Sequence, residues 1–342
     1  MSRLSWLALL LGLGGGLALT SASAEGQVAS GFRFEVVATS IPRPAQLALT
    51  ASGRLVVLSH GWRGDAAAEI FWLDPRGALP VNASVAPRVV IPFAEGPRKT
   101  ALGSLAVDPR SGDLFLGEEN GNRIYRLTGD KRLTPIVVGL NHLLGGSSLA
   151  ADPEGRVVVL DYASFESQLR SEAPLPPSLD WLAAEGYTGP LVFRIDPEEN
   201  VPLPRHLELV APIFPKRPVR RVAGEPLHRF IAVVPMGQGE LTLLNSVGEV
   251  FVLSSDGDLR RLTRLPSGHF HRTSTAAGPD GSVFVSSGFH IRELYRVSPA
   301  GVVTSIARDL GDPQGIAVDG SGALYVAETA LHRIIRIVPA DR

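Results

Sequence analysis

The chain has 342 residues, with 33 lysines and arginines against 34 aspartates and glutamates, a formal net charge of −1 and no cysteine. A nearly neutral chain has no electrostatic attraction for nucleic acid or for an anionic membrane, so we expect neither as a partner. Without cysteine, disulfides and cysteine-linked lipid anchors are excluded, and a large hydrophobic core must stabilise the protein.

Residues 1–24 have the pattern of an export signal. Arg3 supplies a short basic segment, an apolar run follows from Trp6 to Leu19, and Ala22-Ser23-Ala24 fits a small-x-small cleavage site. A retained membrane anchor is the alternative, but the apolar run is short for a bilayer span and contains three consecutive glycines. We predict a cleaved signal peptide and a periplasmic or secreted domain at 25–342.

The rest of the chain is an internal repeat of short strands. A strand–turn–strand unit recurs around five glycines: Gly53, Gly112, Gly155, Gly281 and Gly322. A sixth, poorer copy lies at 230–253, and the interval after Gly53 contains a loop-rich segment, 60–100. A period of about 40 to 45 residues with four strands per unit is typical of a β-propeller. The sequence therefore predicts an all-β fold with six blades.

The last repeat unit lacks a fourth strand, and the start of the chain has one strand to spare. Fourth strands are expected at 133–138 and 302–307, but the last unit ends after three, at Ile337. The strand at 32–38 precedes the first unit and could supply the missing one. Because an open blade would leave an exposed sheet edge, we predict that this strand pairs with the last blade and closes the ring. The alternative is a loose N-terminal strand.

Residues 161–227 interrupt the repeat. Segments 164–170 and 178–185 each predict a short helix, the second with Ser178 as N-cap and Gly186 as terminator. Segment 189–195 returns to a strand, and 216–221 forms a basic cluster. This partly helical insertion is either a lid over one face of the ring or a solvated excursion.

The sequence between Gly322 and Ile337, GALYVAETALHRIIRI, resembles the NHL-repeat β-propellers, as does its sister copy between Gly112 and Leu127. It also resembles the wider six-bladed group that includes gluconolactonase-like and soluble sugar-dehydrogenase-like proteins. The resemblance implies a six-bladed propeller with its ligand site at the mouth of the central channel. It does not select an activity, because this architecture hosts lactonases, dehydrogenases, lyases and binding modules.

In such propellers the ligand site lies where the innermost strands begin. The corresponding residues here are neutral hydrogen-bonding groups: Gln46, Ser104, Ser148, Thr273, Ser274 and Gln314. A calcium-dependent lactonase needs carboxylates in this ring. The Glu that the gluconolactonase-like pattern places before the first strand is replaced here by Pro44-Ala45-Gln46, which counts against a standard lactonase.

Carboxylates occur instead at the ends of the second strands, at Glu118, Glu119, Asp161 and Glu328. Glu118 and Glu328 each stand five residues before an arginine. Because a glutamate recurs at this position in the two copies that match best, we expect it to cap its turn or to pair with that arginine. Asp161, where the insertion begins, is the better candidate for ligand binding.

The segment that leads into the fifth unit contains His269, His271 and Arg272. It resembles the histidine-containing segment of quinone-dependent sugar dehydrogenases. That resemblance implies a histidine as general base and an arginine near the quinone, and a histidine near its ordinary pKa suits proton abstraction. The alternative is a polar loop before an inner strand. His228-Arg229 could face the same channel.

The favoured hypothesis is a monomeric, exported propeller that binds a small polar ligand or a partner protein at the channel mouth. The alternative is a sugar or alcohol dehydrogenase using quinone and calcium, with His271 or His269 as base and Arg272 nearby. A calcium-dependent lactonase is a third hypothesis, and it requires ligands that the sequence does not supply.

Overall fold

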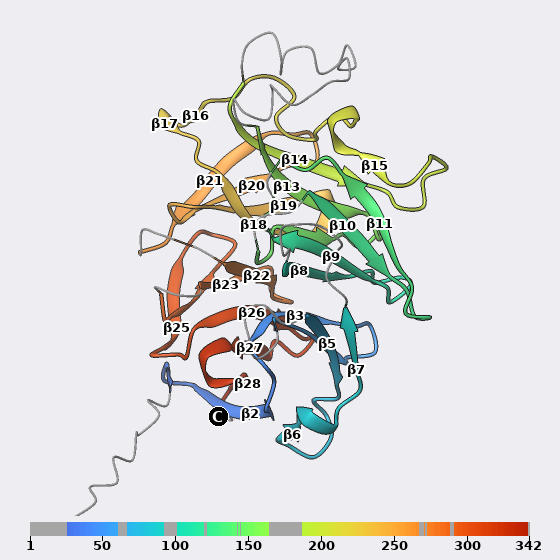
Figure 1. Ribbon diagram of the computed structural model, residues 1–342. Helices are drawn as coiled ribbons and strands as arrows, with labels where there is room; N and C mark the ends of the chain where they lie inside the picture. Colours follow the sequence, from blue (N-terminus) through green and yellow to red (C-terminus); the bar gives the residue numbers. More distant parts are fainter. Residues whose placement is uncertain are drawn as a thin grey trace, which may run out of the picture.

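The computed structural model describes residues 26–60, 67–91, 101–119, 122–141, 143, 145–163, 187–266, 270, 272–287 and 291–340. The chain forms a six-bladed β-propeller (Figure 1). Each blade is an antiparallel meander whose first strand lines the central channel. Within the described residues, no helix is long and apolar enough to cross a membrane.

Blades 1 to 3 follow the chain. Blade 1 consists of β3 (Pro44–Leu49), β4 (Leu55–Ser59), β5 (Ala68–Leu73) and β7 (Arg88–Ile91). Blade 2 consists of β8 (Ala101–Val107), β9 (Leu114–Glu119), β10 (Arg123–Leu127) and β11 (Leu133–Val138). Blade 3 consists of β12 (Leu149–Ala151), β13 (Val157–Ala163) and β14 (Gly189–Ile195).

Blades 4 to 6 complete the ring. Blade 4 consists of β18 (Phe230–Pro235), β19 (Leu241–Asn245), β20 (Glu249–Leu253) and β21 (Leu259–Arg264). Blade 5 consists of β22 (Thr273–Ala277), β23 (Val283–Ser287), β24 (Leu294–Val297) and β25 (Val303–Arg308). Blade 6 consists of β26 (Pro313–Val318), β27 (Leu324–Glu328), β28 (Arg333–Pro339) and β2 (Phe32–Thr39).

Short strands extend the outer edges of the blades. β1 (Gln27–Val28) pairs with β25, whereas β6 (Val81–Asn82) and β15 (Arg205–His206) pair in parallel with β2 and β11. β16 (Arg221–Val222) and β17 (Glu225–Pro226) form a small hairpin. Such additions reduce the exposed sheet edge of a propeller.

The glycines that marked the repeat all serve one purpose. They lie in the turns between the first and second strands of five blades, with φ between 75° and 85°. A side chain is strained in this left-handed region, so glycine is the residue that these tight turns require. The repeat in the sequence therefore reflects a repeated backbone conformation.

The N-terminal strand closes the ring, as predicted. β2 pairs antiparallel with β28, from Phe32 opposite Pro339 to Ala38 opposite Ile334. Val37 is fully buried in a hydrophobic cluster formed by blades 6 and 1, which also contains Phe71. The first and last strands of the propeller thus share one core.

The structure corrects three assignments. Segment 60–100, expected to be loop-rich, contains β5 and β7 and completes blade 1. The copy at 230–253, expected to be poor, is a regular part of blade 4. Blade 3 is the irregular one, because within the described chain its third strand pairs outward only through the isolated bridge between Val192 and Phe214. Segment 189–195, placed in the insertion, is β14 of blade 3. The expected helices and residues 1–24 lie outside the described residues.

We expect the substitution Val37→Asp to unfold the ring. It places an unpaired carboxylate where the wild-type side chain is fully buried, which costs about 3–5 kcal/mol in free energy of unfolding. The matched control, Arg33→Ala, changes an exposed side chain of the same strand and should alter stability by about 0.5 kcal/mol or less. Denaturant unfolding measures both. Equal midpoints for wild type and Val37→Asp would contradict closure by β2.

Candidate functional site

The candidate site lies on one face of the propeller. In every blade the first strand begins and the second strand ends on the same side, which we call the mouth face. Of the predicted ring, Ser148 directly precedes β12, whereas Gln46, Thr273, Ser274 and Gln314 lie within the first three residues of their strands and Ser104 lies in the middle of β8. The structure therefore places these six residues around the channel, but each is at most 3% exposed.

The ring residues largely satisfy one another. Ser274 Oγ donates to Gln46 Oε1 at 2.8 Å, and the hydroxyl oxygens of Ser104 and Ser148 are also 2.8 Å apart. Gln314 Nε2 donates to Asp312 Oδ2 at 3.0 Å. The first of these bonds links blades 5 and 1 and the second links blades 2 and 3, so these residues form the floor of the mouth.

Ser147 crosses the channel just below this floor. Its backbone N–H donates to Thr273 O at 3.0 Å, and its carbonyl accepts from Val233 N–H at 2.8 Å. Its side-chain oxygen accepts from Thr275 N–H at 3.1 Å. Ser147, in the segment that leads into β12 of blade 3, therefore bridges blades 4 and 5.

Beyond Ser147, towards the opposite face, the channel opens into a cavity of about 450 Å³. All six inner strands line it, mainly with aliphatic side chains such as Leu47, Leu105 and Ile316. This cavity lies at the other end of the inner strands from the predicted site. Its lining is mainly apolar but includes Ser147, Asp152 and Thr275, whereas the described ring at the mouth is polar.

An ion pair spans the mouth. Arg272, just before β22 of blade 5, donates from Nε to Glu119 Oε1 at 3.1 Å, at the end of β9 in blade 2. The two blades are diametrically opposite in the ring. A Cβ atom at Gly103 would lie 2.7 Å from Glu119 Cβ, so glycine there makes room for this carboxylate. Arg272 has φ of 47°, an uncommon conformation that occurs where surrounding structure constrains the backbone.

His60 lies beside this ion pair. It follows β4 in blade 1 and is 9% exposed. Burial is the largest effect on the imidazole and lowers its pKa below the ordinary 6.5. The charge of Glu119 raises the pKa, those of Arg272 and Arg43 lower it, and a hydrogen bond to the Leu102 backbone raises it. The net direction is downward, so the ring is neutral at pH 7.

This environment leaves one nitrogen of His60 available. Nε2 is buried and has no hydrogen-bond partner among the described residues. In a neutral imidazole one ring nitrogen carries the hydrogen and the other is an acceptor. The buried hydroxyls of Thr273 and Ser287 likewise lack a partner within the described chain. Buried polar atoms without partners are rare and call for an explanation.

Asp161 and Arg229 form a second polar cluster on the same face. Asp161 Oδ2 accepts from Asn141 N–H at 3.0 Å and from its side-chain amide at 3.2 Å. The Arg229 guanidinium lies 5.5 Å from the centre of the Tyr162 ring, and Asp161 is close enough to raise its pKa against the larger, lowering effect of burial. Arg229, which the sequence placed near the channel, does contribute to this face.

The recurring carboxylates have structural partners, and Glu328 has those that were expected, whereas Glu118 accepts its hydrogen bond from a tyrosine. Glu328 binds Arg333 Nε at 2.5 Å and accepts from Gly311 N–H at 2.8 Å. Glu118 accepts from the Tyr125 hydroxyl at 2.7 Å. These contacts fix the turns after the second strands.

His269 and His271 lie outside the described residues, and their catalytic role stays a prediction. Of that trio the structure describes Arg272, which it brings to Glu119 and His60. The sequence did not single out His60. A signal was available, since His60 immediately follows the second strand of its blade, as Glu119 ends the second strand of blade 2.

Among the described residues, the carboxylates of the mouth do not converge as a calcium site requires. Calcium needs several oxygen ligands converging on one point, whereas Glu119 faces Arg272 and Asp161 accepts from Asn141. In the described part of the chain, no three acidic or histidine side chains are grouped so that they could hold a metal ion.

No protein-family model and no curated protein sequence matches the chain. Solved structures do match. The chain is similar to a gluconolactonase from Xanthomonas campestris, with 15% identity over 91% of this chain and 94% of that one, at a TM-score of 0.54. An inactive histidine-to-alanine variant of virginiamycin B lyase from Staphylococcus aureus, with quinupristin, has 12% identity over 90% and 99%, at a TM-score of 0.52. A streptogramin B lyase has 12% identity over 90% and 98%, at 0.51. At these identities the likeness shows the fold alone.

The ion pair predicts opposite effects of its two members on His60. Arg272→Ala removes a repelling charge and should raise the pKa of His60, whereas Glu119→Gln removes an attracting one and should lower it. An NMR pH titration, with the His60 signal assigned from a His60→Gln spectrum, measures both. Shifts of the same sign in the two variants would contradict the arrangement.

His60 should also make the fold acid-sensitive. Its folded pKa is lowered, so below the ordinary 6.5 the unfolded chain binds a proton that the folded site refuses. The free energy of unfolding therefore decreases as the pH is lowered below 6.5. The decrease is at most about 1.4 kcal/mol per pH unit and ends at the pKa of the folded state. The stability difference between wild type and His60→Gln should shrink accordingly. The control, His206→Gln, changes an exposed histidine on β15. Parallel pH profiles for wild type and His60→Gln would exclude this contribution.

Proposed function

We propose that the chain is an exported propeller that binds a small, hydroxyl-bearing ligand at the mouth of its central channel. The carrying observation is the buried His60, whose pKa is lowered and whose Nε2 has no hydrogen-bond partner among the described residues. We assign the ring hydrogen to Nδ1, which leaves Nε2 as the acceptor. A ligand hydroxyl is the natural donor to such a nitrogen. The buried hydroxyls of Thr273 and Ser287, in blade 5, support the same ligand chemistry.

The surrounding charges favour a polar ligand without a large net charge. Arg272 and Glu119 neutralise each other across the mouth, and Asp161 lies near Arg229. Preformed hydrogen-bonding groups in a buried setting give specificity, because an incorrect ligand would leave them unpaired. Similar propellers are described as lyases and gluconolactonases, which supports a ligand site on this architecture without selecting a reaction.

A second candidate is an enzyme that removes a proton from this ligand, with His60 as general base. The lowered pKa and the lack of a partner at Nε2 within the described residues favour it, since a base must be neutral to accept a proton. The charges of Arg272 and Arg43 both act on His60, and either cation could stabilise negative charge on the substrate.

Binding can be tested with a panel of aldoses, polyols and sugar lactones. We expect at least one to raise the melting temperature of the wild type, because a ligand at about 100 times its dissociation constant stabilises by about 2.7 kcal/mol. His60→Ala combined with Ser287→Ala should abolish the shift, whereas His206→Ala should preserve it. No shift with any compound, or a shift unchanged in the double variant, would contradict binding at the mouth.

Turnover separates the two candidates. If His60 acts as a base, His60→Gln should retain ligand binding but lose conversion of the compound, measured by NMR of the mixture. Binding without conversion in the wild type supports a binding module.

Export has its own test. Mass spectrometry of the mature protein from the producing cells should give an N-terminus at Glu25, after the predicted cleavage site. A cytoplasmic chain that keeps residues 1–24 would contradict export but would leave the mouth site unaffected.

A further inference from the structure

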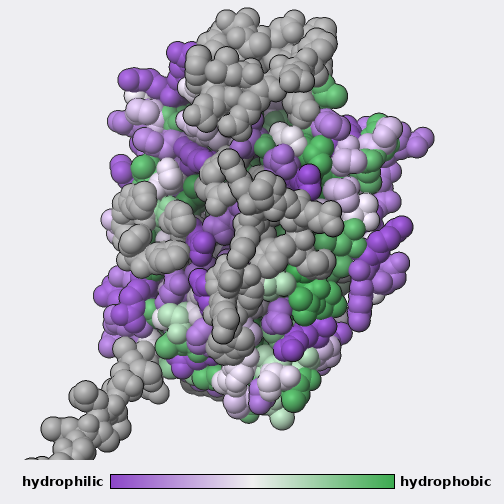
Figure 2. All heavy atoms as spheres, in the orientation of Figure 1, coloured by the Kyte–Doolittle hydropathy of each residue, from purple (hydrophilic) through white to green (hydrophobic). Residues whose placement is uncertain are grey.

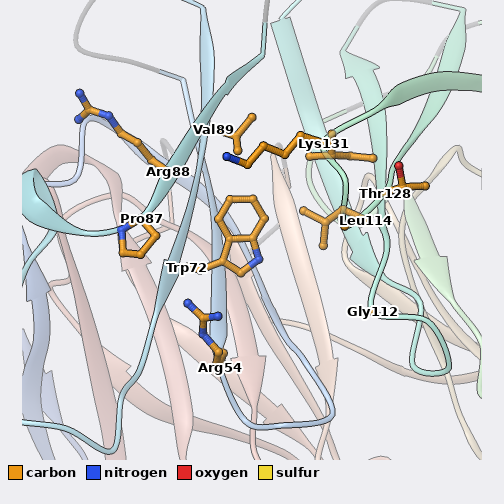
Figure 3. A pocket seen from close by; sticks show the side chains of 11 residues that line it. Arg54, Trp72, Pro87, Arg88, Val89, Gly112, Leu114, Thr128 and Lys131 are labelled. Carbon is orange, nitrogen blue, oxygen red and sulfur yellow. The ribbon is translucent and has the colours of Figure 1, made fainter.

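A second cavity lies far from the mouth, between blades 1 and 2 on the opposite face. It has a volume of about 260 Å³. Trp72 on β5 forms its floor, and Val89, Leu114 and Leu127 contribute to its walls (Figure 3). We call this cavity the Trp72 groove. In Figure 2, hydrophobic surface over β7, at the right of the view, is bordered by the hydrophilic turn between β10 and β11.

Comparison among the blades marks Trp72 as unusual. Each third strand has one residue at the equivalent register position, and in four other blades this is an arginine: Arg126, Arg194, Arg296 and Arg336. Each of these arginines lies in an ion pair, with Asp113, Asp152, Asp280 and Glu35 respectively. Blade 4 has Val252 there. Blade 1 thus replaces a recurrent structural ion pair with a half-buried indole.

Two cations flank this indole. Figure 3 shows Lys131 reaching over Trp72 from one side and Arg54 approaching it from the other. Both residues are exposed, and neither has an ion-pair partner within the part of the chain that the structure describes. An aromatic plane with cations at its edges is suited to a ligand that is both flat and anionic.

The nearby carboxylates are already engaged. Asp74 binds Arg76 Nε at 2.9 Å, and this hydrogen bond, with a smaller contribution from the charge of Arg54, lowers its pKa to about 2. Asp130 accepts from the Thr128 hydroxyl, and Glu69 lies 3.9 Å from Arg88. The charges of Arg54 and Lys131 therefore give the groove a local excess of positive charge.

We propose that the Trp72 groove binds a small aromatic carboxylate, with its ring stacked on the indole of Trp72 and its carboxylate held by Arg54 and Lys131. The aliphatic walls bury the ring, and the volume suits a ligand of one or two fused rings. This site is independent of the mouth, because it lies at the other end of the strands and shares no residue with it.

The test titrates the full protein with 2-naphthoate by NMR, following the indole N–H signal of Trp72. We expect saturable binding with a dissociation constant of about 1 mM or below. Trp72→Ala should weaken binding at least about tenfold, whereas Trp72→Phe, which keeps an aromatic plane, should weaken it less. Arg54→Gln and Lys131→Gln should each weaken it about threefold or more, with the loss smaller at high salt.

Two controls make the result specific. The neutral analogue 2-naphthylmethanol should bind more weakly and be insensitive to Lys131→Gln. Val90→Ser, which alters an exposed neighbour on β7, and His60→Ala, at the mouth, should leave naphthoate binding unchanged. Absence of saturable binding in the wild type, equal binding by folded Trp72→Ala, or loss of binding in His60→Ala would overturn the proposal. Binding of an acidic peptide but not of naphthoate would overturn it in favour of a protein partner.

Discussion

The pairing of β2 with β28 is the contact on which the rest of the structure depends. A propeller holds its inner strands at fixed distances only when the ring is closed, because each blade packs against two neighbours. Here the closing strand comes from the N-terminus and the strand it joins from the C-terminus. The mouth combines His60 of blade 1, Glu119 of blade 2 and Arg272 of blade 5. Their relative positions therefore depend on closure far from the site.

The channel is divided into two chemically different ends. Ser147 and the hydrogen-bonded ring around it separate a polar mouth from an apolar cavity. At the mouth, opposite charges cancel and a neutral imidazole keeps an unused acceptor. In the Trp72 groove between blades 1 and 2, an indole stands at the position where other blades have an arginine that forms an ion pair.

The sequence predicted the fold well because the repeat is local. Glycines in left-handed turns and short β-branched strands recur at fixed spacing, and both are visible without a structure. Blade 3 was harder, because its outer edge is reduced to an isolated bridge at Phe214. The site was less predictable. Gln46 and Ser274 were correctly placed at the channel, but their mutual hydrogen bond depends on approach between non-adjacent blades. Burial lowers the pKa of His60, and the distant charges of Glu119 and Arg272 act on it in opposite directions, which no local pattern records.

The most direct measurement is the protonation state of His60 in the folded protein. A long-range nitrogen–proton NMR correlation at about pH 7.5 distinguishes the two neutral tautomers from the charged ring. The account predicts a neutral imidazole with its hydrogen on Nδ1 and a bare Nε2 that shifts when a ligand of the mouth is added. A charged ring, or a hydrogen on Nε2, would contradict it, because the mouth would then present a donor instead of the acceptor that defines the proposed site.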